Sequence, residues 1–239
     1  MTSPRALFLD AGGTLFIERR PRPAIYATVA RAHGGHGSEE DAADLMSRAY
    51  ETLPQSIEGH FRFSIEWFRH FHESVLADLG VSSARREAAH EELVQRFENP
   101  KTYRLFKEVP SVLASITEAG VSIGIISNWS ERLPVLLNGL GIGDFISFVV
   151  TSAEMKVEKP ERAVFERALF RAGVPASEAI HAGDHLQRDV AGALGAGLNA
   201  VHIDRSAESE GSTGEGVPVL TDLRGILALV EQHCHASRS

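Results

Sequence analysis

The fold of this chain is decided near its beginning, by the stretch Leu7-Phe8-Leu9-Asp10-Ala11-Gly12-Gly13-Thr14-Leu15. An apolar run leads directly into an aspartate, and a turn of small residues follows. A short run of this kind is typical of a strand buried on both faces of a parallel sheet. The small residues let backbone N–H groups approach an anion. We therefore expect Asp10 at the carboxyl end of a buried strand, beside a ligand-binding turn.

Four further apolar runs repeat this strand pattern later in the chain. With Ala6 to Leu9, they are Val121 to Ile126, Phe148 to Val150, Ala179 to Ala182, and Ala200 to Ile203. Glycine, a common helix stop, follows each of three amphipathic stretches, which are Val109 to Ala119, Glu131 to Leu140, and Glu161 to Ala172. Pro160 stands where a first-turn proline is tolerated. The alternation predicts an α/β fold with a Rossmann-like parallel sheet core.

Residues 17–103 differ from the rest of the chain, because no strand pattern appears there and apolar residues recur at helical spacing. A helix over residues 61–79 would carry one apolar stripe, formed by Phe61, Ile65, Phe68, Val75 and Leu79. The length of 239 residues allows one enlarged domain or a core with a smaller partner. We predict an α/β core from residues 1–16 and 104–239, and a helical insert from residues 17–103. Ser206 to Gly216 is typical of a surface loop.

Composition narrows the choice of partners and compartment. The sequence is 43% hydrophobic and 23% charged, as in an ordinary globular protein, and its formal net charge is −8. That balance repels nucleic acid and anionic membranes, and no apolar run is long enough to span a bilayer. Cys234 is the only cysteine, which excludes an intramolecular disulfide framework and a cysteine-based zinc site. Because the first residues are also too few for a signal peptide, we expect a cytoplasmic protein.

Polar residues follow the predicted strands at their carboxyl ends, the edge where open parallel sheets bind ligands. The first strand delivers Asp10, the second Ser127 and the fourth Asp184, while Lys159 lies in the loop after the third. Such a set suits phosphoryl transfer, which needs a nucleophile, a hard cation held by carboxylates, and hydrogen-bond donors. Asp10 could form an aspartyl-phosphate, Lys159 would neutralise charge, and Ser127 would donate to a phosphoryl oxygen. Asp189 would contact the cation through water or orient its ligands.

These residues, in this order, resemble the four motifs of the haloacid dehalogenase superfamily. Leu7 to Leu15 resembles the first motif, Ile125-Ile126-Ser127-Asn128 the second, Lys159-Pro160 the third, and Gly183-Asp184 with Asp189 the fourth. The resemblance implies Asp10 as nucleophile, Mg²⁺ as cofactor, and an inserted helical cap that closes over the site and selects the substrate. It also implies metal ligands at Asp10, Asp184, Asp189 and the backbone carbonyl of Gly12.

Two segments of the insert narrow this resemblance. Ala24-Ile25-Tyr26-Ala27-Thr28 and Arg31-Ala32-His33-Gly34 are similar to the subgroup that includes haloacid dehalogenase-like hydrolase domain-containing protein 3.

The sequence departs from the family pattern at Gly12. Phosphatases of the superfamily carry a second aspartate at this place as general acid and base, a role that contributes about 10²–10⁴-fold to the rate. Dehalogenases generally have a tyrosine there and use no magnesium, whereas phosphonatases recruit a lysine from the cap. Lys101 is the only lysine of this insert and lies near its end. The carboxylates of the fourth motif disfavour a metal-free dehalogenase.

The leading hypothesis is a Mg²⁺-dependent hydrolase of a small phosphorylated metabolite, with catalytic residues Asp10, Ser127 and Lys159. Substrate contacts are expected from Gly13, Thr14 and Asn128. The alternatives are a catalytically weak protein that binds a phosphorylated ligand or a protein partner, and a 2-haloacid dehalogenase. His185 could replace the missing acid, while Ser127 and Asp189 could merely support helix N-termini. The sequence leaves the substrate and the oligomeric state open.

Overall fold

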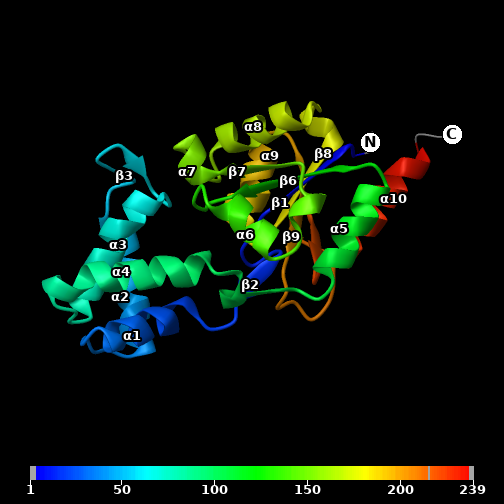
Figure 1. Ribbon diagram of the computed structural model, residues 1–239. Helices are drawn as coiled ribbons and strands as arrows, with labels where there is room; N and C mark the ends of the chain where they lie inside the picture. The colour runs from blue at the N-terminus through cyan, green and yellow to red at the C-terminus, as the bar shows by residue number, and fades with distance from the viewer. Residues whose placement is uncertain (1–3, 215, 237–239) are drawn as a thin grey trace.

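A computed structural model describes residues 4–214 and 216–236 (Figure 1). Residues 1–3 and the side chain of Cys234, on which the expected location partly depends, lie outside the described part. The strands are β1 (Ala6–Leu9), β2 (Phe16–Glu18), β3 (Ser56–Ile57), β4 (His60–Phe61), β5 (Tyr103–Leu105), β6 (Ser122–Ser127), β7 (Phe148–Thr151), β8 (Ala179–Gly183), β9 (Asn199–Ile203), β10 (Gly211–Ser212) and β11 (Pro218–Leu220). The α-helices are α1 (Arg22–Ala32), α2 (Glu39–Thr52), α3 (Ile65–Asp78), α4 (Ser83–Glu98), α5 (Val109–Glu118), α6 (Leu133–Gly139), α7 (Ser152–Met155), α8 (Arg162–Ala172), α9 (Gly192–Gly195) and α10 (Arg224–Ala236), and a π-helical segment spans Leu186–Ala191.

A seven-stranded sheet forms the centre of the core, in the order β10-β11-β9-β8-β1-β6-β7. β10 runs antiparallel to β11, and the other neighbours pair in parallel. β1 lies between β6 and β8, and all four of its residues are fully buried. The predicted α/β fold with a parallel sheet is therefore confirmed, and the strand with the deciding sequence lies inside the sheet.

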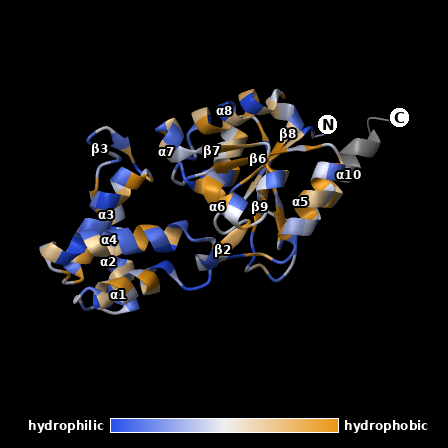
Figure 2. Ribbon diagram, in the orientation of Figure 1, coloured by the Kyte–Doolittle hydropathy of each residue, from blue (hydrophilic) through white to orange (hydrophobic). Residues whose placement is uncertain are grey.

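Helices cover both faces of the sheet, because successive strand residues point to opposite sides. On one face, Leu7 and Leu9 of β1 belong to the apolar cluster that also contains α5 and α10 residues. On the other face, Ala6 and Phe8 belong to a cluster with residues of α8 and α9. Figure 2 shows the apolar strands enclosed between these helical layers. This enclosure fixes the strand ends, and with them the position of Asp10.

The inserted helices α1 to α4 have an apolar core of their own, to which Tyr26, Trp67 and Leu76 contribute. They lie together beside the α/β core in Figure 1. The strands β2 and β5 lie at the two ends of the predicted insert and pair in antiparallel fashion, with Phe16 opposite Leu105. The predicted boundaries at residues 16/17 and 103/104 fall within this pair, and the division itself stays a prediction.

Some local predictions were wrong. The insert contains the strand pair β3–β4 and most of β2, although no strand pattern was visible there, since these strands have only two or three residues each. The helix expected over residues 61–79 begins at Ile65, because Ser64 caps it by accepting a hydrogen bond from the Trp67 N–H at 3.2 Å. Phe61 therefore lies in β4. Pro160 lies before the N-cap residue of α8, not in its first turn.

Candidate functional site

Three neighbouring strands bring the predicted polar residues to one edge of the sheet. Asp10 follows β1, Ser127 ends β6, and Asp184 follows β8. The Asp10 N–H donates to the carbonyl of Ala182 at 3.0 Å, which continues the β1–β8 ladder up to the aspartate. The parallel register thus places these side chains together, as expected at the carboxyl ends of such strands.

Asp10 and Lys159 form the buried centre of the site. Asp10 Oδ1 accepts hydrogen bonds from Lys159 Nζ at 2.6 Å and from Ser127 Oγ at 3.0 Å. Burial raises the pKa of the Asp10 carboxyl, and the Lys159 ammonium opposes that rise. Although burial lowers the pKa of Lys159, the charges of Asp10 and Asp189 raise it above its usual value, so the ammonium stays protonated. One cation therefore lies between two buried carboxylates.

Asp189 is held by three hydrogen bonds. Its Oδ1 accepts from Lys159 Nζ at 2.6 Å and contacts His181 Nε2 at 2.8 Å, and its Oδ2 accepts from the His185 N–H at 3.1 Å. Although burial opposes the effect, the Lys159 charge and the His181 hydrogen bond hold the pKa of Asp189 below its usual range. An added Cβ at Gly183 would overlap this carboxylate. Glycine at position 183 is therefore required for Asp189 to reach the site.

Asp184 completes a group of three carboxylates with Asp10 and Asp189, whose ligand oxygens lie within 4.8 Å of one another. Asp184 is the exposed member. Partial burial of its carboxyl and the charges of the other two aspartates raise its pKa to about 6. Its carboxylate occupies the space that a side chain at position 13 would need, and Gly13 has a φ of +84°. Both the turn and the approach of Asp184 therefore require glycine at this position.

The space beside Gly12 is filled by an aromatic ring. A Cβ built on Gly12 would lie 3.1 Å from Cζ3 of Trp129. The Trp129 ring makes edge-to-face contact with Phe16 at 5.7 Å between centroids, and Tyr103 lies 6.2 Å away. Arg22 lies over the same ring, with Cζ 5.6 Å from its centroid. The place where the sequence resemblance implies a second aspartate therefore holds a glycine with a tryptophan ring packed beside it.

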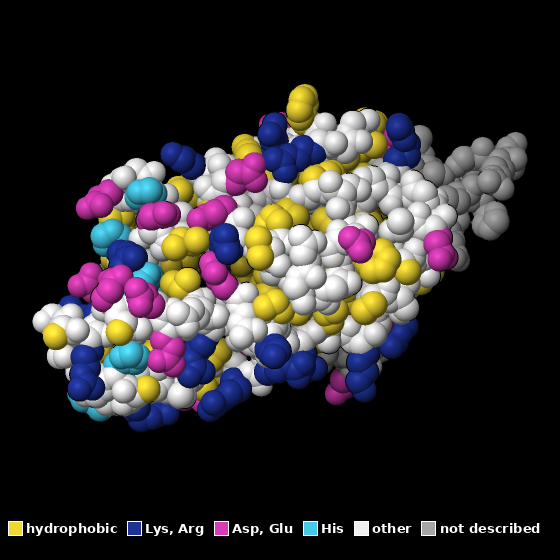
Figure 3. Space-filling model, viewed as in Figure 1, with side chains coloured by type: hydrophobic (Ala, Val, Ile, Leu, Met, Phe, Trp, Pro, Cys, Tyr) yellow, Lys and Arg dark blue, Asp and Glu magenta, His cyan; other side chains and the backbone are white. Residues whose placement is uncertain are grey.

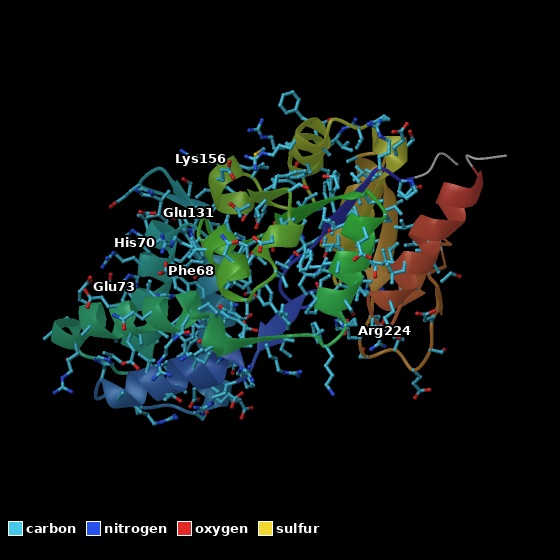
Figure 4. All side chains as sticks on the ribbon, turned by 45° about the vertical axis from the view of Figure 1, so that its right-hand side comes forward. Phe68, His70, Glu73, Glu131, Lys156 and Arg224 are labelled. Carbon is cyan, nitrogen blue, oxygen red and sulfur yellow. The ribbon has the colours of Figure 1, made fainter. Side chains whose placement is uncertain are left out.

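A cavity of about 440 Å³ opens above these residues, between the core and the insert. Figure 3 shows a hollow between the two parts, with apolar side chains on both of its sides. In Figure 4, Phe68 of α3 lies on the side of the insert that faces α6, while His70 and Glu73 lie on the outer side. The cavity is lined by Asp10, Gly12, Gly13, Phe16, Glu18, Arg22, Tyr26, Phe63, Ile65, Phe68, His72, Val94, Phe97, Glu98, Tyr103, Ser127, Asn128, Trp129, Ser130, Arg132, Val135, Leu136, Lys159, Asp184, His185, Arg188 and Asp189.

Of the three residues predicted to contact substrate, Asn128 and Gly13 line the cavity and also form hydrogen bonds within the protein. Asn128 brackets Lys159: its Oδ1 accepts from the Lys159 N–H at 2.8 Å, and its Nδ2 donates to the Lys159 carbonyl at 3.2 Å. The Gly13 N–H donates to the carbonyl of Phe16 at 2.8 Å. Thr14 is buried and does not line the cavity. Asn128 therefore positions the backbone of Lys159, and the Gly13 N–H closes the turn.

Two residues of the site were missed in the sequence. His181 is fully buried in β8 and touches Asp189, and a polar residue inside an apolar strand was the signal that could have revealed it. Trp129 follows the second motif directly, but its contact with Gly12 joins segments that are far apart in the chain. No pattern within either segment indicates that contact.

Comparison with known proteins agrees with this geometry. The sequence model of the haloacid dehalogenase-like hydrolases matches residues 4–197. The chain belongs to this family of hydrolases. Haloacid dehalogenase-like hydrolase domain-containing protein 3 of Bos taurus is 29% identical over 219 residues, which cover 90% of this chain and 87% of that protein. The resemblance to that subgroup is thereby confirmed.

Other relatives of this haloacid dehalogenase-like hydrolase differ in their chemistry. Phosphoserine phosphatase of Thermus thermophilus is 31% identical over 227 residues, covering 86% of this chain and 91% of that enzyme. The structure of 2-haloacid dehalogenase from Pseudomonas syringae superposes with a TM-score of 0.72 at 22% identity, covering 96% and 99% of the two chains. This fold thus accommodates both reactions. Among the described helices, none combines the length and hydrophobicity that a transmembrane span requires.

Proposed function

We propose that this hydrolase is a cytoplasmic, Mg²⁺-dependent phosphatase that cleaves a small phosphate ester through an aspartyl-phosphate at Asp10. The observation that carries the proposal is the group of three aspartates around Lys159. Three carboxylates and one ammonium leave two formal negative charges at the floor of the cavity. A phosphate would be repelled by this floor unless a divalent cation were bound there.

The donor set fits magnesium, because it offers only oxygen ligands. Asp10 and Asp184 would bind the ion directly, together with the carbonyl of Gly12. Asp189 already accepts three hydrogen bonds, so it would orient the site or reach the ion through water. When bound, Mg²⁺ would supply positive charge to the oxygens of the transferring phosphoryl group.

The protein side chains would perform the remaining steps. An oxygen of the Asp10 carboxylate attacks phosphorus and forms the acyl phosphate, while the bond from phosphorus to the ester oxygen breaks and the alcohol leaves. Water then hydrolyses the acyl phosphate, which releases phosphate and restores the Asp10 carboxylate. Lys159 and Ser127 already lie within hydrogen-bond distance of Asp10, so they are in place to donate to phosphoryl oxygens at the same centre. The insert would exclude bulk water from the cavity.

The test is turnover of a panel of phosphate esters by the purified protein with magnesium, compared with Asp10→Asn. Mass spectrometry of the quenched enzyme should show one phosphoryl group on the peptide that contains Asp10. Chelation should abolish turnover. Absence of turnover above the variant would refute the proposal.

A second candidate is a catalytically weak protein that binds a phosphorylated ligand or a protein partner with the same site, and Gly12 with its packed Trp129 favours it. That candidate predicts binding of a phosphate ester to the magnesium-loaded protein with no turnover. Hydrolysis of a 2-haloacid that persists with chelator would instead indicate a dehalogenase.

A further inference from the structure

The cavity offers no carboxyl group where the leaving oxygen would take its proton. The Cβ direction of Gly12 points at the Trp129 ring, and Phe16 and Tyr103 pack against that ring. An acid would therefore have to come from another part of the cavity wall. Without one, the P–O bond breaks only if the departing oxygen is stable as an anion.

The two glutamates that line the cavity are each paired with an arginine. Glu18 accepts from Arg22 Nε at 3.0 Å, and Glu98 lies 3.2 Å from Arg132 Nε. The carboxylate of each glutamate is therefore engaged in an ion pair with a guanidinium. The same pairs neutralise both arginines, so they provide little charge for a second anionic group of a substrate.

His72 also lines the cavity, but its Nδ1 lies 2.9 Å from Nδ1 of His90, and burial, then the neighbouring His90, lowers its pKa well below 6.5. The other histidine on the described wall is His185. Its Nδ1 accepts the backbone N–H groups of Gln187 and Arg188, both at 3.2 Å. Its Nε2 has no hydrogen-bond partner among the described residues. His185 Nδ1 therefore caps the helical segment that begins at Leu186. The effect of His185→Asn on the leaving-group dependence shows whether this side chain supplies the proton.

The wall above the aspartates is dominated by aromatic rings. Arg22 extends this surface, since its guanidinium lies over Phe97 at 5.2 Å and over Trp129 at 5.6 Å. An aromatic group of a substrate packs favourably against aromatic rings and against a guanidinium. The aromatic residues of the wall are Phe16, Tyr26, Phe63, Phe68, Phe97, Tyr103 and Trp129.

We propose that the substrates are phosphate monoesters of phenols, which rests on the proposed phosphoryl transfer to Asp10. A phenol has a pKa of about 10, whereas an aliphatic alcohol lies near water, at roughly 16. The Asp10 oxygen forms a bond to phosphorus while the bond from phosphorus to the aryl oxygen breaks, and the electron pair leaves with the phenolate. The phenolate takes a proton from solvent. Water then transfers its oxygen to phosphorus, releases its proton to solvent, and restores the Asp10 carboxylate.

The chemical test is the dependence of kcat/KM on leaving-group pKa across a series of substituted phenyl phosphates with magnesium. We expect a steep fall as the pKa of the phenol rises. Benzyl phosphate, which has the same ring but leaves as an alkoxide, should be at least about 10²-fold slower than phenyl phosphate, the minimum usually gained from an acid. A flat series in the wild type, which becomes steep in His185→Asn, would identify His185 as the acid and overturn the proposal.

The recognition test separates binding from chemistry. Calorimetry with Asp10→Asn and magnesium should show phenylphosphonate binding at least about tenfold more tightly than methylphosphonate. Phe68→Leu should reduce this preference. Phe170→Leu is the matched control, since Phe170 is 77% exposed on α8 and does not line the cavity. Equal binding of the two phosphonates would overturn the proposal.

The outcomes distinguish this inference from the function on which it rests. Turnover of alkyl and aryl esters at similar kcat/KM would refute the inference and leave the phosphatase intact. Absence of turnover of every ester above Asp10→Asn would refute both.

Discussion

Restoring a carboxyl group at position 12 should succeed only if the ring of Trp129 is shortened at the same time. The backbone at Gly12 lies outside the left-handed region, so conformation does not forbid a side chain. The obstacle is the 3.1 Å separation between the added Cβ and Cζ3 of Trp129, before the carboxyl atoms are placed. Gly12→Asp alone should therefore lower the free energy of unfolding by about 1–3 kcal/mol, as overpacking does, and should not accelerate turnover.

The double variant Gly12→Asp/Trp129→Leu provides both the acid and the space for it. For an ester with a poor leaving group, such as benzyl phosphate, kcat/KM should rise by about 10²–10⁴-fold over wild type, the usual contribution of a general acid. Phenyl phosphate should gain much less, because its leaving group needs little protonation. Phosphate release with magnesium measures both gains, and urea denaturation reports folding.

Trp129→Leu alone is the control, and it should show no such gain. The reasoning would be refuted if Gly12→Asp alone gave the full acceleration, because the ring would then be no obstacle. It would also be refuted if the folded double variant gained nothing on benzyl phosphate.

Three further perturbations test the electrostatics. Lys159→Met should lower the free energy of unfolding by about 3–5 kcal/mol, because two buried carboxylates lose their shared ammonium. Added Mg²⁺ should restore part of the lost stability. An unchanged midpoint of urea denaturation would contradict the pairing. His181→Leu should raise the magnesium concentration needed for half-maximal activity by about 10–100-fold, because Asp189 loses its hydrogen bond to His181. His181→Gln should partly restore the wild-type value. Titration of activity with magnesium measures both effects. Burial, then the neighbouring His90, lowers the pKa of His72 well below its usual 6.5. The unfolded chain therefore binds this proton first, so stability should fall as pH drops below about 6.5, by up to about 1.4 kcal/mol per pH unit. Urea denaturation from about pH 5 to 7 measures how steeply the free energy of unfolding depends on pH. His72→Phe should flatten that dependence. His60→Gln, which changes a side chain that is 48% exposed, should leave it unchanged.

The sheet and the edge that carries the candidate site could be predicted because their signals are local. β1 and β8 are buried along their whole lengths, so each is a short run that is apolar except for His181 in β8, and a predicted site aspartate directly follows each strand. Parallel pairing then places Asp10 beside Ser127 and Asp184 without further information. The position of Lys159 relative to Asp10 follows from the same topology, and the two atoms lie 2.6 Å apart.

Other parts of the site depend on contacts that no local pattern records. The pairing of Phe16 with Leu105 and the contact of Trp129 with Gly12 each join segments separated by about a hundred positions. The strands β3 and β4 have two residues each, too few to show a period. Asn128 matched its motif, but only the structure shows that its amide holds Lys159 by both backbone groups.

Charge, more than fold, separates the two reactions found among the structural neighbours. A 2-haloacid carries a carboxylate, and the cavity floor has two more negative than positive charges among Asp10, Asp184, Asp189 and Lys159. Without a divalent cation that floor would repel the haloacid and a phosphate alike. A bound cation would favour binding of the phosphate more than binding of the haloacid, because the phosphate carries more negative charge to be neutralised near the ion. The same fold can thus serve either reaction, and the third carboxylate, Asp184, is the feature on which the proposed metal dependence of this chain rests.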